Sequence, residues 1–110
     1  MRSQKFNLLG LLSIAVMITV AASKAQTFTG EVSDSMCGAK HMMANKADCT
    51  RACISKGSNY ALVVGDKVYT LQTNDKAALD QLNSLAGENA KVTGTATGDT
   101  IEVSKVAAAK

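Results

Sequence analysis

The three cysteines and the only histidine of this chain lie in one short segment, at Cys37, His41, Cys49 and Cys53. Three residues separate Cys37 from His41, and three separate Cys49 from Cys53. Residues at that spacing share one face of a helix. Thiolate sulfur and imidazole nitrogen are the ligands that zinc takes in tetrahedral sites. The segment is therefore a candidate metal site formed by Cys37, His41, Cys49 and Cys53.

Methionines in the same segment bring copper into consideration as a second metal. Met36, Met42 and Met43 lie beside the cysteines. Thioether and thiolate sulfur are soft ligands, which Cu(I) prefers. Methionine also fills irregular gaps in small cores, which explains these residues without a metal. We expect no cofactor as the first interpretation, with zinc, and then copper, as the alternative.

A disulfide bond is the other explanation for the cysteines, and it is the one we expect. Exported proteins meet oxidising conditions. Closing a loop of about 15 residues contributes roughly 3 kcal/mol in the chain-entropy model. Cys49 and Cys53 on one helix face are poorly aimed at each other, so one of them pairs with Cys37. The prediction is a bond between Cys37 and Cys53, with Cys49 as the alternative partner.

A small thiol redox protein is a third hypothesis, in which Cys49 and Cys53 form the reactive couple. Three residues separate these cysteines, whereas thiol oxidoreductases commonly have two. Asp34 or Ser35, which precede Cys37, are expected to cap the following turn. No motif in the sequence identifies a catalytic group, and we expect the protein not to be an enzyme.

The first 25 residues have the layout of a secretory signal peptide. Arg2 and Lys5 precede an apolar stretch from Leu8 to Ala22, and small residues precede a cleavage point after Ala25. As a helix the stretch would span about 22 Å, which is less than the roughly 30 Å of a bilayer core. We therefore predict a cleaved signal (1–25), export to the periplasm or the exterior, and membrane contact only through an uncleaved signal.

Residues 26–110 are expected to form one small domain without nucleic-acid partners. The chain has 12 basic and 9 acidic residues, and three of the basic ones lie in the signal. The remainder is therefore neutral, whereas nucleic-acid binding needs clustered positive charge. Two Phe, two Tyr and no Trp supply few rings for stacking on bases.

The pattern of the domain predicts a mainly β (α+β) fold. Strands are expected at 27–33, 59–64, 67–72, 90–97 and 100–106, and a helix at 74–85. An insertion (34–57) after the first strand is expected to hold two short helices, 39–45 and 49–56, the second capped by Asp48. This order predicts a five-stranded OB-like barrel with a helix between strands three and four. An open sheet with helices on one face is the competing architecture.

Several runs of sequence resemble a group of small exported bacterial proteins of unknown function. They are TGEVSDSMCGAKHM, DCTRACISKGSNYALVVGDKVYTL and AKVTGTATGDTIEVSKV. The resemblance implies a signal peptide and one OB-like β domain with a Cys-His-Cys-Cys insertion, and it implies no activity. We expect an exported, non-enzymatic binding or interaction domain, stabilised by a disulfide, whose partner is a protein or a small ligand not identified by the sequence.

Overall fold

The computed structural model describes residues 24–40 and 44–109. The predicted signal peptide therefore lies almost entirely outside the described residues, as do His41, Met42 and Met43. Within the described ranges, no helix has the length and apolar character needed to cross a membrane.

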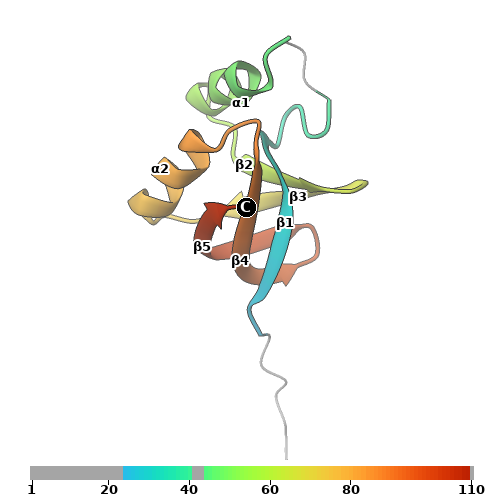
Figure 1. Cartoon of the computed structure of the whole chain (residues 1–110), viewed down its shortest axis with the longest axis vertical. Helices are drawn as coiled ribbons and strands as arrows, with labels where there is room; N and C mark the ends of the chain where they lie inside the picture. Colours follow the sequence, from blue (N-terminus) through green and yellow to red (C-terminus); the bar gives the residue numbers. More distant parts are fainter. Residues whose placement is uncertain (1–23, 41–43, 110) are drawn as a thin grey trace, which may run out of the picture.

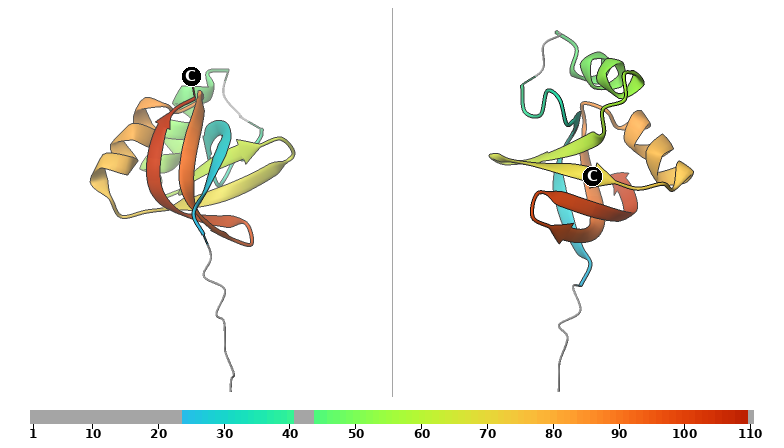
Figure 2. Two further views of the ribbon diagram at one scale, coloured as in Figure 1. Left: turned by 60° about the horizontal axis from the view of Figure 1, so that its bottom comes forward. Right: turned by 180° about the vertical axis from the view of Figure 1, so that it is seen from behind.

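Five strands form a single mixed sheet that closes into a barrel in the order β1-β2-β3-β5-β4 (Figures 1 and 2). Neighbouring strands are antiparallel, except that β3 and β5 run parallel. The mainly β prediction is confirmed, and the strand positions agree closely with those expected. The strands are β1 (Gln26–Asp34), β2 (Tyr60–Val64), β3 (Lys67–Gln72), β4 (Asn89–Thr97) and β5 (Thr100–Ala108).

Two helices interrupt the strand order at the predicted places. Helix α1 (Lys46–Ser55) lies between β1 and β2, and α2 (Lys76–Ser84) lies between β3 and β4. The two helices are neighbours at one side of the barrel (Figure 1). The Arg51 guanidinium of α1 donates to the Asn83 carbonyl of α2, with nitrogen–oxygen distances of 2.8 and 3.2 Å.

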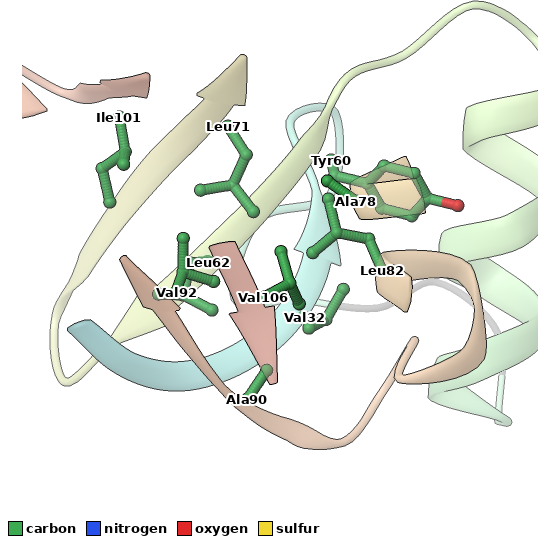
Figure 3. Packing of buried hydrophobic residues seen from close by; sticks show 10 residues of the cluster. All are labelled: Val32, Tyr60, Leu62, Leu71, Ala78, Leu82, Ala90, Val92, Ile101 and Val106. Atoms are coloured by element: carbon green, nitrogen blue, oxygen red, sulfur yellow. The ribbon is translucent and has the colours of Figure 1, made fainter. Parts of the chain in front are cut away.

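The core fills the barrel and continues beneath α2 (Figure 3). Alternate strand residues point inward because strand side chains alternate between faces. From the helix, Ala78 and Leu82 join this cluster, and Leu82 is fully buried. The buried cluster comprises Val32, Tyr60, Leu62, Leu71, Ala78, Leu82, Ala90, Val92, Ile101 and Val106. The buried residues of this cluster therefore come from the strands and α2, and Ile54 of α1 packs against them as a partly buried side chain.

The predicted helix at 39–45 is not formed by those of its residues that the structure describes. Ala39 lies in a turn, Lys40 in irregular structure, and Ala44 and Asn45 in bends. The cause is local, since Asn45 has an extended backbone and caps α1 by accepting the Asp48 N–H at 3.0 Å. The prediction that Asp48 caps this helix was therefore also wrong. Asp48 lies in the first turn of α1, where its negative charge interacts favourably with the helix dipole.

Two glycines allow the strands to approach closely. A Cβ at Gly30 would collide with the Val63 carbonyl oxygen, and one at Gly94 with the Glu102 carbonyl oxygen. Gly94 also follows a β-bulge in the pairing of β4 with β5. The barrel therefore depends on the absence of a side chain at these two positions.

Replacing Gly30 by Ala should destabilise the barrel by about 1–3 kcal/mol, the typical cost of forcing extra volume into a packed site. The measurement is urea unfolding. Thr29→Ala is the control, because Thr29 is exposed in the same strand and exposed substitutions usually stay within about 0.5 kcal/mol. Equal unfolding midpoints for the two variants would contradict this account of Gly30.

Candidate metal centre

The end of β1 positions a buried carboxylate and the first cysteine. Asp34 is fully buried. Its Oδ2 accepts the backbone N–H groups of Met36 at 3.0 Å and Cys37 at 2.9 Å. Gly38 then turns the chain with a φ of 58°, and its N–H donates to the Asp34 carbonyl at 2.8 Å. The predicted capping role of Asp34 is confirmed, and the turn presents Cys37 to α1.

Helix α1 supplies the other two cysteines from one face. Cys49 is 2% exposed and Cys53 is half-buried. The Cys37 Sγ lies 3.6 Å from the Cys49 Sγ and 3.8 Å from the Cys53 Sγ. Because Cys53 follows Cys49 by four positions along the helix, both sulfurs reach the turn that follows β1. The three thiols of the chain therefore meet at one point.

Four potential ligand atoms converge there. A carboxylate oxygen of Asp34 and the three cysteine sulfurs all lie within 4.8 Å of one another. A tetrahedral zinc site with zinc–sulfur bonds of about 2.3 Å places its sulfurs about 3.8 Å apart. The observed sulfur–sulfur distances of 3.6 and 3.8 Å match that spacing. Two of the sulfur–sulfur distances in the cluster are therefore those of a tetrahedral zinc site.

The second oxygen of Asp34 gives an independent indication of a cation. Asp34 Oδ1 is buried and accepts no hydrogen bond in the described part of the chain. Leaving a buried polar atom without a partner is costly. A metal ion among the sulfurs would satisfy this oxygen. Sequence reasoning missed Asp34 as a ligand because its capping role already explained the residue.

The electrostatic environment of Cys53 also favours a positive charge. Burial raises the pKa of the Cys53 thiol to about 12, and the neighbouring Cys37 thiol and the negative charge of Asp34 act in the same direction. The thiolate is therefore disfavoured while the cluster contains no cation. Metal binding reverses this preference, because a metal ion holds coordinated thiols in the thiolate form.

Of the predicted ligands, the structure brings together Cys37, Cys49 and Cys53, while His41 lies outside the described residues. The Sγ atoms of Cys37 and Cys53 are not bonded to each other here. The disulfide between these two residues stays a prediction.

In the reduced, metal-free protein, iodoacetamide should modify Cys53 more slowly than an ordinary thiol. Its rate should keep rising above pH 9 toward pH 12, because the folded thiol retains its proton through that range. Asp34→Asn should accelerate the reaction by removing a negative charge, whereas Asp48→Asn, at an exposed position of α1, should not. Trypsin places the three cysteines of the mature chain on the separate peptides 26–40, 47–51 and 52–56, so mass spectrometry reads each rate. Fast modification of Cys53 at pH 8 would refute the prediction.

Comparison with known proteins corrects the resemblance inferred from the sequence. A model of the defensin-like family matches residues 1–68, which is more than half of the chain. The match extends over β1, α1 and β2 into β3, and it includes all three cysteines. No curated protein and no solved structure matches. The resemblance to small exported bacterial proteins of unknown function was therefore wrong, and the chain belongs to the defensin-like family.

Proposed function

We propose that this protein is a small exported interaction domain in which a zinc ion joins α1 to the barrel. The ligands are the sulfurs of Cys37, Cys49 and Cys53, with Asp34 as the fourth ligand. The observation that carries the proposal is the convergence of three thiols and a carboxylate within 4.8 Å. Membership of the defensin-like family and the predicted signal (1–25) support a small secreted protein.

The geometry favours zinc over copper. The sulfur spacing fits a tetrahedral site with bonds of zinc–thiolate length. Cu(I) was considered because of the neighbouring methionines, but Met36 is 69% exposed and its backbone N–H, not its sulfur, takes part in the described contacts of the cluster. A carboxylate is also a ligand that zinc accepts readily, whereas Cu(I) prefers sulfur.

The charge of the surrounding segment offsets that of the proposed centre. Three thiolates and a carboxylate around a divalent ion leave two excess negative charges. The connection and helix that carry the cysteines also carry four basic residues, Lys40, Lys46, Arg51 and Lys56. Asp48 adds one further negative charge to this segment. The net attraction between the basic segment and the anionic centre therefore supports the assignment.

Helix α1 gains from such a tie because it has few other anchors, among them the partly buried Ile54 and the hydrogen bond from Arg51 to the Asn83 carbonyl. Its buried residues are Cys49 and Thr50. Lys46 forms an ion pair with Glu31 at 3.5 Å, in which the lysine side chain is 60% exposed. Exposed ion pairs contribute about 0–1 kcal/mol. A zinc ion with four protein ligands has no open position for a substrate and stabilises the fold. This structural role is the one proposed here.

We further propose that the barrel is OB-like and that it binds a ligand. The five-stranded closed ring with α2 between β3 and β4 supports an OB-like barrel, an architecture that binds ligands on its surface. A cleft of about 390 Å³ lies between the helices and the barrel. Its lining includes the neutral polar side chains of Asn59, Gln72 and Asn74 and the carboxylate of Glu102. This lining favours a neutral or cationic partner over an anion.

Zinc binding is tested by native mass spectrometry of the purified protein after exposure to zinc. The expected result is one zinc ion per chain, and a loss of affinity of at least about tenfold in Cys49→Ser. Ser55→Ala is the matched control, because Ser55 lies in the same helix and donates to the Ala52 carbonyl away from the sulfurs. A wild-type protein that takes up no zinc while its three thiols are reduced would refute the proposal.

The fourth ligand is tested by comparing Asp34→Asn with His41→Ala. Asn retains an oxygen that accepts the N–H groups of Met36 and Cys37 but lacks the carboxylate charge. We expect Asp34→Asn to weaken zinc binding by about 10–100-fold, a range seen when groups around a metal are altered, and His41→Ala to change it by less than about twofold. Competition with a chromogenic chelator gives both values. The reverse ranking would assign the fourth position to His41 and leave Asp34 as a turn cap.

A further inference from the structure

Any disulfide in the cluster must include Cys37. Cys49 and Cys53 are four residues apart in α1, and such residues have Cβ atoms about 5–6 Å apart. A disulfide needs Cβ atoms about 3.5–4.5 Å apart. A bond between these two would therefore require α1 to unwind locally. Cys37 lies on the turn after β1 and has both other sulfurs within 3.8 Å.

The three thiols differ in their access to solvent. Cys37 and Cys53 are half-buried, whereas Cys49 is 2% exposed. A disulfide-containing molecule from solution can therefore reach Cys37 but not Cys49. The buried Cys49 sulfur lies 3.6 Å from the Cys37 sulfur, which is shorter than the 3.8 Å between the Cys37 and Cys53 sulfurs. This is the arrangement of an accessible attacking thiol and a protected resolving thiol.

We propose that a small-molecule disulfide oxidises this centre through Cys37, which then bonds to Cys49 and expels the zinc ion. The inference rests on the proposed zinc site and adds its regulation. The Cys53 thiolate takes a proton from water when the zinc ion leaves, and Cys53 is a thiol in the oxidised form. The protein is thereby a redox-dependent zinc donor, in which zinc is bound under reducing conditions and released under oxidising ones.

The chemistry balances in two exchange steps. The Cys37 thiolate attacks one sulfur of the external disulfide, forming a mixed disulfide and releasing one thiolate. The Cys49 thiolate then attacks Cys37 Sγ, forming the internal disulfide and releasing the second thiolate. Two electrons pass from the two cysteines to the external disulfide, and each released thiolate takes a proton from water. Zinc does not change oxidation state, and it leaves as the hydrated ion because two of its ligands are consumed.

The experiment adds oxidised glutathione to the zinc-loaded protein and follows zinc release with a chromogenic chelator. Two molecules of reduced glutathione should form for each zinc ion released. Tryptic mapping after thiol blocking should show peptide 26–40 linked to 47–51, with peptide 52–56 carrying the blocking group. Cys53→Ser should still form the same link, and Cys37→Ser should form no internal disulfide.

Three results would overturn the inference: zinc retained under oxidation, a main product that links Cys37 to Cys53, or a link between Cys49 and Cys53 in Cys37→Ser. The same mapping on metal-free protein separates this inference from the zinc proposal. Failure to bind zinc refutes the proposed function, whereas normal zinc loading with the wrong linkage or no release refutes only the redox step. Circular dichroism of each variant checks that it folds.

Discussion

The candidate site depends on the buried carboxylate of Asp34. This residue ends β1 opposite Tyr60 in the pairing with β2. One of its oxygens fixes the turn that holds Cys37, while the other is buried and has no hydrogen-bond donor among the described residues. The same side chain therefore shapes the loop and brings a carboxylate oxygen to the thiols. Replacing Asp34 by a residue without a hydrogen-bond acceptor changes both the backbone of this turn and the charge of the cluster. A substitute that retains the acceptor, such as Asn, changes the charge alone.

The molecule consists of two parts that are stabilised differently. The barrel buries a continuous apolar cluster that includes α2, so hydrophobic burial stabilises it directly. Helix α1 has two buried residues, Cys49 and Thr50. It is otherwise held by the partly buried Ile54, by the hydrogen bond from Arg51 to α2 and by its sulfurs. A small domain gains little from its core alone. A cross-link between the end of β1 and α1 therefore contributes where burial is weakest.

The sequence predicted the strands and most of the thiol cluster, and it failed where local geometry decided the outcome. Alternating apolar residues and the turn glycines Gly65 and Gly98, both with φ near 60°, located the strands. Sequence spacing grouped the cysteines, but it did not show that the Asp34 carboxylate lies among them. The helix at 39–45 was predicted from composition, whereas the Asp34 turn and the Asn45 cap fix the described ends of that segment in other conformations.

The parallel pairing of β3 with β5 has a consequence for how the chain folds. It joins residue 70 to residue 100, and the intervening chain forms α2 and β4 before the ring can close. The entropy lost in closing such a loop must be overcome before its contacts become favourable, and non-local pairings of this kind slow folding. Closure of the ring is therefore the late event, and the antiparallel hairpins of β2 with β3 and β4 with β5 are the segments able to form first. During synthesis, the cysteine cluster emerges before the strands that complete the barrel.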